Sequence, residues 1–530
     1  MSRSHRIQEA LLTQVVGCMA LLLFVVGCAT NAVTGKQEIR FIPESQELAL
    51  GSKNYGPMQQ SQGGEQMTFP EINEYVSRVG NKLAAVSDRP DFDYQFVVLN
   101  NPVPNAWALP GGKIAVNRGL LTELQSEAEL AAVLGHEIVH AAARHSGSGM
   151  QRGILLQAGM MGLGLALQDH DYRDIIVGAG GMSAQFVNQK YGRDAERESD
   201  TYGIKYMAAA GYDVTQAVEL QRTFVRISKE EGGGHEGWLT GLFASHPPSV
   251  ERVKANQLTI QNYAEGGFIG RDEYETMIAP LREAEPAYTN LEEGYKALER
   301  GRPKEALSLA SLAIDLQPGE AHFFGLSGKA KAATRDYRGA LADLNEAISL
   351  NDHYFDFYLQ RGLIRKKLGE TGPAETDLEM SIELLPTGAG HEALGLLAIS
   401  DGRTSDALDH LRTASGTPSE AGLSSRIMLT RLELPAHPER YIRALVGRDS
   451  GDMLTVRIVN QSPLSVRNVQ FTVQTLTPQG EIASTSPMVL QRPIPAGAFS
   501  DAPTRVGPFR SDEHIATLVR LTIDAASIAE

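Results

Sequence analysis

The sequence predicts a multi-domain α+β protein: a mainly α-helical domain with a small β-sheet, then an α-solenoid, and last a small antiparallel β-sandwich. Three observations lead to this prediction. A chain of 530 residues is too long for one hydrophobic core, since domains average about 150 residues. Small residues recur at a fixed interval between residues 288 and 385. After Pro435, apolar and polar residues alternate, which is typical of strands.

The composition is that of a folded protein. With 42% hydrophobic and 21% charged residues, the chain is not largely disordered, collagen-like or a polytopic membrane protein. Its net charge of −15 disfavours nucleic acid as a partner, because that binding depends on Lys and Arg that neutralise phosphates. The two cysteines, Cys18 and Cys28, lie near the N-terminus. A metal site further along must therefore use His and carboxylate ligands.

Residues 1–27 are predicted to be a lipoprotein signal peptide. Arg3 and Arg6 precede an uncharged run over 10–27, which is the layout of an export signal. The run ends in Val-Val-Gly before Cys28 and resembles a lipobox, so Cys28 is the expected lipidation site. Ala29 follows it instead of Asp, and we expect a periplasmic protein that is lipid-anchored to the outer membrane. The alternative is a single membrane-spanning anchor with a chance cysteine, since about 20 apolar residues span a bilayer.

Residues 28–270 form the next predicted domain. We expect helices over 45–55 and 72–86 and strands over 94–99 and 113–116. Ser126 and Glu129 form a capping box, which opens a further helix. Residues 154–167 are Gly- and Met-rich and too short to span a membrane, so we expect a buried or lid-forming segment there.

The sequence His136-Glu137-Ile138-Val139-His140 carries the chemistry. Two histidines four residues apart share one helix face and can bind one zinc ion through neutral imidazole nitrogens. Glu137 can then act as the general base of peptide hydrolysis. The alternative is an exposed helix with two unrelated histidines. However, residues 130–134 are apolar and predict burial, and buried polar side chains without partners cost several kcal/mol.

A third protein ligand must lie downstream. The metzincin pattern fails because Ala143 and Ser146 stand where Gly and His would be required. No acidic residue occurs over 141–168, which excludes a thermolysin-like glutamate there. Glu196 and Asp200 share one face of a predicted helix, with Glu198 pointing away. Glu196 can bind zinc, and Asp200 can accept a hydrogen bond from a ligand histidine and thereby fix its tautomer. Alone, such an acidic helix start would indicate only capping.

Residues 285–420 are predicted to form a repeat domain. An interval of 34 residues separates successive members of four sets: Gly294, Gly328 and Gly362; Ala306, Ala340 and Ala374; Ala313, Ala347 and Ser381; and Pro318, Asp352 and Pro386. This pattern resembles the tetratricopeptide repeat, in which small residues let paired helices approach closely. A fourth, degenerate copy follows one residue early, at Gly395. The alternative, an unrelated helical bundle, would not show this fixed period.

Residues 440–530 are predicted to form a β-sandwich-like interaction domain. Leu454, Val456 and Ile458 alternate with polar residues, as in a half-buried strand. No cluster of His, Asp or Glu occurs there, so we expect no chemistry in this domain.

Several stretches together resemble the HtpX-like and CAAX-protease-like family of gluzincin zinc metallopeptidases, and within it the periplasmic, BepA-like lipoprotein branch with C-terminal tetratricopeptide repeats. The stretches are residues 31–50, 105–112, 136–140, 196–200 and 245–248 with Arg252. The chain departs from the family in two ways, since HtpX relatives carry transmembrane helices and the terminal β domain is not part of the branch pattern.

The resemblance implies one Zn²⁺ per chain, bound by His136, His140 and Glu196, with Glu137 as the general base. It also places His246 near the metal, as a removable fourth ligand or, with Arg252, as an oxyanion donor; a plain loop residue is the alternative. We further expect the strand at Gly112, Lys113, Ile114 and Ala115 to be a sheet edge on which an extended substrate pairs.

The leading hypothesis is a zinc-dependent endopeptidase of protein quality control. It would cleave misfolded or stalled outer-membrane proteins, with the repeats docking substrate or the outer-membrane protein assembly machinery. A second hypothesis is a tetratricopeptide scaffold or chaperone whose peptidase domain is silenced, by His246 or by residues 154–167. A third is an enzyme that acts on cell-wall peptides, although no wall-binding module is recognisable.

Overall fold

The computed structural model describes residues 27–151, 191–230 and 242–529, which form two compact units. Unit 1 comprises residues up to 364 together with 383–385, and unit 2 comprises 365–382 and 386–530. The predicted signal peptide, apart from Gly27, and the Gly- and Met-rich segment over 154–167 lie outside the described residues. Among the described helices, none is both long and apolar enough to cross a membrane.

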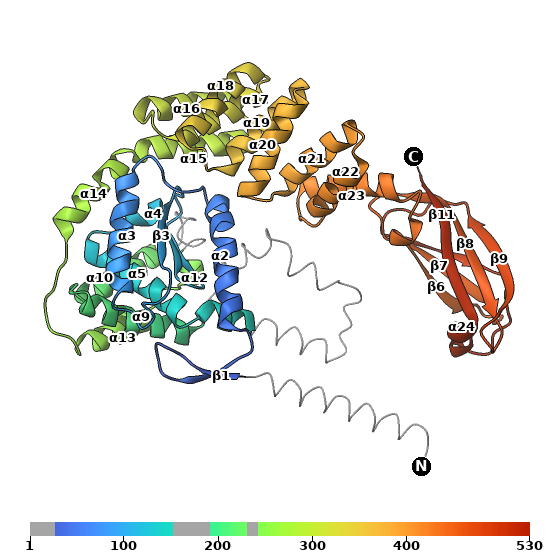
Figure 1. Ribbon diagram of the computed structural model, residues 1–530, viewed down its shortest axis with the longest axis horizontal. Coiled ribbons are helices and arrows are strands. Elements are labelled where there is room, and N and C mark those ends of the chain that lie inside the picture. Colours follow the sequence, from blue (N-terminus) through green and yellow to red (C-terminus); the bar gives the residue numbers. More distant parts are fainter. Residues whose placement is uncertain (1–26, 152–190, 231–241, 530) are drawn as a thin grey trace, which may run out of the picture. The chain divides into compact units, whose positions relative to one another are not determined.

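A three-stranded sheet lies near the start of unit 1. It consists of β3 (Gln95–Leu99), β4 (Ala106–Leu109) and β5 (Lys113–Asn117) in the order β3-β5-β4. One face packs against α2 (Glu44–Ser61) and the other against α3 (Pro70–Ala84). Figure 1 shows these two helices flanking the sheet. Side chains alternate between the two faces of a strand. Because each face packs against a helix, apolar side chains are buried on both faces.

The prediction that residues 112–115 form an edge strand is wrong. β5 pairs in parallel with β3 and antiparallel with β4. Its backbone groups are therefore hydrogen-bonded on both sides, and a substrate strand cannot pair with it. Gly111 and Gly112 have φ of 83° and 79°, and they make the tight turn that returns the chain from β4 into the centre of the sheet. β4 is the outer strand that packs against the helix of the histidines.

Two helices carry most of the site. α5 (Glu127–Ala142) begins at Ser126, whose hydroxyl accepts a hydrogen bond from the Glu129 N–H at 3.2 Å. α9 (Arg193–Ala209) packs against α5 where Gly135 meets Gly203. A Cβ on Gly203 would lie only 3.1 Å from the His136 nitrogen. The absence of side chains at this crossing brings the two helices into close contact.

The remaining elements of the first domain are short or peripheral. They are the hairpin β1 (Gly27–Thr30) and β2 (Gln37–Arg40), and the helices α4 (Arg118–Leu121), α10 (Thr215–Glu230), α12 (Leu242–Ser245), α13 (Val250–Ile260) and α14 (Arg271–Glu283).

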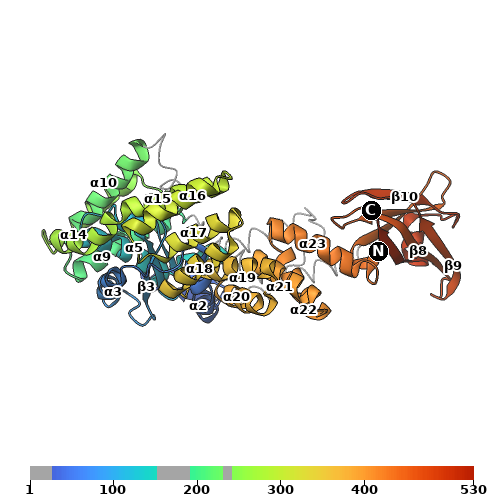
Figure 2. The same ribbon diagram turned by 90° about the horizontal axis from the view of Figure 1, so that it is seen from above.

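Paired helices follow in the register predicted for the repeats. In unit 1 these are α15 (Glu285–Glu299), α16 (Pro303–Leu316), α17 (Ala321–Ala333), α18 (Tyr337–Leu350) and most of α19 (Phe355–Leu368). Unit 2 continues with α20 (Thr371–Leu384), α21 (Gly388–Ser400), α22 (Thr404–Ser415) and α23 (Glu420–Glu433). The helices are visible in a second view in Figure 2. Ala306, Ala340 and Ala374 are fully buried, which is why this register requires small residues.

The first repeats of unit 1 pack directly on the preceding domain. Arg118 is 1% exposed, and its guanidinium lies 3.7 Å from the centre of the Tyr288 ring. It also lies 3.4 Å from Glu292 and 3.8 Å from Glu285. Gln60 of α2 adds a hydrogen bond to the His353 carbonyl at 2.6 Å. These contacts hold the two parts together within the unit.

The C-terminal part of unit 2 is a β-sandwich of two three-stranded sheets, ordered β10-β7-β6 and β11-β8-β9. A short 3₁₀ helix, Pro438–Arg440, precedes it, and α24 (Asp512–Leu518) precedes its last strand. The strands are β6 (Ile442–Arg448), β7 (Leu454–Asn460), β8 (Val466–Leu476), β9 (Ile482–Leu490), β10 (Phe499–Pro503) and β11 (Val519–Ile528). Leu454, Val456 and Ile458 are fully buried. The predicted α+β multi-domain fold class is confirmed.

Candidate functional site

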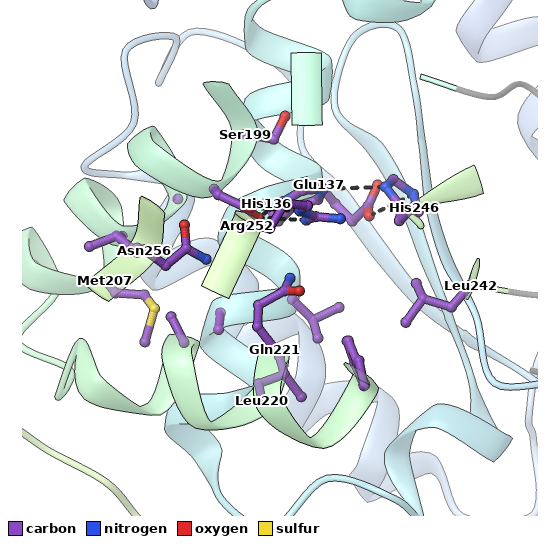
Figure 3. A pocket seen from close by; sticks show the side chains of 17 residues that line it. His136, Glu137, Ser199, Met207, Leu220, Gln221, Leu242, His246, Arg252 and Asn256 are labelled. Carbon is purple, nitrogen blue, oxygen red and sulfur yellow. Dashed lines mark hydrogen bonds and ion pairs between the residues drawn. The ribbon is translucent and has the colours of Figure 1, made fainter. Parts of the chain in front are cut away.

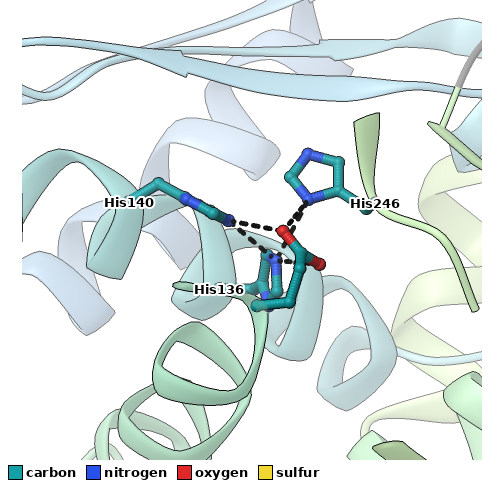
Figure 4. A group of neighbouring side chains, drawn as sticks. His136, His140 and His246 are labelled. Atoms are coloured by element: carbon teal, nitrogen blue, oxygen red, sulfur yellow. Dashed lines mark hydrogen bonds and ion pairs between the residues drawn. The ribbon is translucent and has the colours of Figure 1, made fainter. Parts of the chain in front are cut away.

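Four side chains from three segments converge in unit 1. His136 and His140 come from α5, Glu196 from the first turn of α9, and His246 from the residue that follows α12. One ligand atom of each lies within 4.8 Å of all the others. Figure 4 shows the three imidazoles turned toward a common point.

The spacing of these atoms fits a small tetrahedral ion. The His136 and His140 Nε2 atoms are 3.0 Å apart. The Glu196 carboxylate lies 3.5 Å from the first and 3.3 Å from the second. His246 Nδ1 lies 3.2 Å from His136 Nε2 and 3.0 Å from Glu196. A tetrahedral zinc site with bonds of 2.0–2.1 Å has ligand atoms about 3.4 Å apart, so nitrogen and oxygen donors at these distances suit zinc.

Asp200 and Arg252 contact the candidate ligands His136 and Glu196 and fix their orientation. Asp200 Oδ1 lies 3.1 Å from His136 Nδ1, which leaves Nε2 to face the cluster. The Arg252 guanidinium donates to both Asp200 oxygens at 2.8 and 2.6 Å and lies 2.8 Å from Glu196. It also donates to the Pro247 carbonyl at 3.2 Å. Each of its three guanidinium nitrogens thus has a partner, and Arg252 positions two carboxylates and the His246 loop.

The electrostatics of the cluster favour a cation. Burial disfavours a charge on His136, but Glu196 and Asp200 outweigh it and raise the pKa of His136 to about 10. Burial holds the pKa of His140 well below its usual range. Although burial opposes ionisation, His246 and His136 lower the pKa of Glu196 well below that of a free glutamic acid. Without a metal, His136 would therefore carry a second ring proton and a positive charge at neutral pH.

Glu137 lies beside the cluster and is buried. Its Oε1 is 3.5 Å from His246 Nε2, while its Oε2 has no hydrogen-bond partner among the described residues. Burial raises the pKa of the Glu137 carboxyl above its ordinary value. A carboxylate that is desolvated, unpaired at one oxygen and next to a metal site is suited to accept a proton.

Two neighbours of His140, His145 and Tyr191, were not predicted from the sequence. His145 Nδ1 lies 2.9 Å from His140 Nδ1, and His145 Nε2 lies 3.3 Å from Glu198. Glu198 points away from Glu196, as the helix spacing predicts, and thereby reaches His145. The Tyr191 ring is centred 3.9 Å from the His140 ring. The five-residue spacing from His140 to His145 was a visible signal, but nothing in the sequence indicated Tyr191.

Comparisons with known proteins agree with this geometry. Residues 70–259 match the model of Peptidase family M48. The Arabidopsis thaliana "Mitochondrial metalloendopeptidase OMA1" is 32% identical over 43% of this chain and 44% of its own length. The Vibrio cholerae "Putative beta-barrel assembly-enhancing protease" is 30% identical over 37% of this chain and 40% of its own length. The Escherichia coli "Metalloprotease YcaL" is 26% identical over 44% of this chain and 94% of its own length. The chain thus spans less than half the length of the first two relatives.

Proposed function

We propose that this chain, whose residues 70–259 form a Peptidase family M48 domain, is a zinc-dependent endopeptidase. The observation that carries the proposal is the cluster of His136, His140, Glu196 and His246, whose ligand atoms have the spacing of a tetrahedral site. Glu137 stands next to it, and its Oε2 has no hydrogen-bond partner in the part of the chain that the structure describes. A metal site with an adjacent base is the arrangement that metal-assisted hydrolysis requires.

His136, His140 and Glu196 would hold one zinc ion. A bound zinc ion lowers the pKa of a water molecule and polarises a substrate carbonyl. Glu137 would accept the proton from the attacking water and later deliver it to the leaving amine. Asp200 would keep His136 in the tautomer that presents Nε2, since a ligand histidine needs its other nitrogen hydrogen-bonded. Arg252 would hold Asp200 and Glu196 in place.

His246 would regulate this site. Its Nδ1 stands 3.0 Å from Glu196 and 3.2 Å from His136, at the corner where water and substrate must approach. Its Nε2 is 3.5 Å from Glu137, so His246 also lies next to the base. Pro247 and Pro248 follow it and stiffen the loop. His246 would have to leave this corner before peptide hydrolysis.

The substrates would be misfolded or stalled envelope proteins, with the repeats docking substrate or assembly machinery. Four of the relatives are named beta-barrel assembly-enhancing proteases, one of them as putative, which supports this substrate class. Cys28 would be lipidated and would tether the protein to the outer membrane on its periplasmic side. Replacing Cys28 by Ser should release the protein from membranes, because acyl chains contribute about 0.8 kcal/mol per buried CH₂. Membrane fractionation of the cleaved, unlipidated form tests this, and continued sedimentation with membranes would contradict it.

The proposal is tested by digestion of casein and of an unfolded porin. Wild-type protein should cleave both. The Glu137→Gln variant should fold and bind zinc, but its cleavage rate should be lower by a factor of about 10²–10⁴, since the amide cannot accept a proton. Equal turnover by the variant would show that the base lies elsewhere. The second candidate function is a scaffold or chaperone with a silenced peptidase domain, which the position of His246 favours. Absence of cleavage by both wild type and His246→Ala would favour that candidate.

A further inference from the structure

A cavity adjoins the candidate site. It lies between α5, α9, α10 and α13, and its rim includes His136, Glu137 and His246. Figure 3 shows His136 and Glu137 at the centre of this view, with Leu242 to one side and Met207 to the other. A chain bound with its scissile bond at Glu137 would have a neighbouring side chain beside this cavity.

The walls of the cavity are mostly apolar. The apolar lining residues include Val133, Met207, Leu220, Phe224 and Leu242, and each of these is at least nine-tenths buried. The cavity is small, with a volume of about 40 Å³. A cavity that holds only a few water-sized atoms suits a short side chain, such as that of Asn, Thr, Val or Leu.

Two carboxamides interrupt the apolar walls. Gln221 is 8% exposed and Asn256 is 2% exposed, and Figure 3 shows both amide groups directed into the cavity. The Gln221 Oε1 atom is buried without a hydrogen-bond partner among the described residues. Leaving such an acceptor unpaired costs about 1–3 kcal/mol, so the cavity is built to receive a hydrogen-bond donor.

The charged groups of the lining do not supply that donor. Arg252 is engaged by Asp200 at 2.8 Å and by Glu196 at 2.8 Å. Apart from these ion pairs and from Glu137, His136 and His246 of the candidate site, the lining consists of the Ser199 hydroxyl, neutral amides and apolar carbons. A charged side chain would lose its hydration there without gaining a partner of opposite charge, which is costly.

We propose that this cavity is a specificity pocket for a short, uncharged side chain that ends in an amide or a hydroxyl, next to the scissile bond. The inference rests on the proposed peptidase function. Asn and Thr both donate and accept hydrogen bonds, so either meets the amides of Gln221 and Asn256. The isosteric residues Leu and Val leave these amides unpaired, so peptides that carry Leu or Val bind and react less well.

Matched peptides test the pocket. The full-length protein in detergent is given a peptide library in which Asn is exchanged for Leu, and Thr for Val, on either side of the cleaved bond. Wild-type protein should cleave the Asn and Thr peptides about tenfold faster, since two neutral hydrogen bonds distinguish the pairs. Gln221→Met keeps the shape of the side chain and should abolish or reverse the preference. Glu219→Gln, an exposed position on the same helix, is the control and should keep it.

Binding separates this inference from the proposed function. The Glu137→Gln variant, which should not turn over, is titrated with the same peptides. Tighter binding of the Asn and Thr peptides without cleavage by wild type would overturn the peptidase function and leave the pocket standing. Cleavage with equal or better rates for Leu and Val would overturn the pocket and leave the peptidase standing. Equal binding together with absence of cleavage would overturn both.

Discussion

At the scale of single residues, the site is a balance of buried charges. Three carboxylates, those of Glu137, Glu196 and Asp200, lie within one small region, with Arg252 and three imidazoles around them. Burying so many charges is costly unless they are paired. A divalent cation among the imidazoles would complete the pairing, which is a physical reason to expect a metal here.

The raised pKa of His136 predicts how zinc affinity depends on pH. The folded pKa of about 10 lies above the ordinary value, so zinc must displace one proton from His136 at neutral pH. Affinity should therefore rise about tenfold per pH unit between roughly pH 7 and pH 9 and fall as the pH is lowered. In the metal-free protein, the same proton stabilises the fold fully below the unfolded pKa, and this contribution is lost as the pH rises through about 10. Chelator competition at several pH values measures the slope, and a flat profile would contradict it.

The His246→Ala variant distinguishes the roles of His246. If His246 blocks the corner beside Glu196, its removal should raise basal proteolysis and self-cleavage. If it assists the oxyanion, activity should fall by about 10²–10³. We expect the first result, and initial rates on casein together with zinc content measure it. Unchanged rate and unchanged zinc affinity would remove His246 from the site.

His145 should affect zinc binding without touching the metal. A ligand histidine that binds through Nε2 carries its proton on Nδ1, and His145 lies 2.9 Å from that atom of His140. His145→Ala should weaken zinc affinity about 10–100-fold, the usual effect of removing such a support. His145→Asn, which keeps a hydrogen-bonding group, should recover part of it. Chelator competition measures both, and wild-type affinity in the alanine variant would contradict this role.

At the scale of secondary structure, the crossing of α5 and α9 sets the distance between the histidines and Glu196. A side chain at Gly203 would press against the His136 backbone. Gly203→Val should therefore destabilise the protein by about 1–3 kcal/mol and lower its zinc affinity. Gly192→Ala at the start of α9 is the control, because a Cβ there meets nothing within 4 Å. Denaturant unfolding and zinc content measure both, and a Gly203→Val protein with wild-type values would show that the crossing tolerates a wider spacing.

At the scale of the whole molecule, unit 1 joins the domain of the candidate site to the first repeats through Arg118. This residue is 1% exposed and stacks on Tyr288. Arg118→Met should destabilise unit 1 by about 1–3 kcal/mol, because the buried Asn100 side-chain oxygen loses the hydrogen bond that the Arg118 Nε donates at 3.0 Å. Arg78→Met removes the exposed ion pair with Glu273 and should cost less than about 1 kcal/mol. Urea unfolding compares the two, and equal effects would show that the junction adds no stability.

The sequence by itself determined features that depend on local spacing. The four-residue spacing of His136 and His140, the cap at Ser126 and the 34-residue register of the repeats each follow from helix geometry. The alternation around Val456 follows in the same way from the two-residue period of a strand. These predictions needed no knowledge of distant contacts.

Only the tertiary structure decided what lies next to what. It placed β5 in the centre of its sheet, engaged Arg252 with Asp200, and brought His145 and Tyr191 against His140. It also turned Gln221 into the cavity beside the cluster. The physical reason is that each of these contacts joins side chains whose meeting depends on how whole elements pack. Periodicity states which face of an element is buried, but it does not state which neighbour buries it.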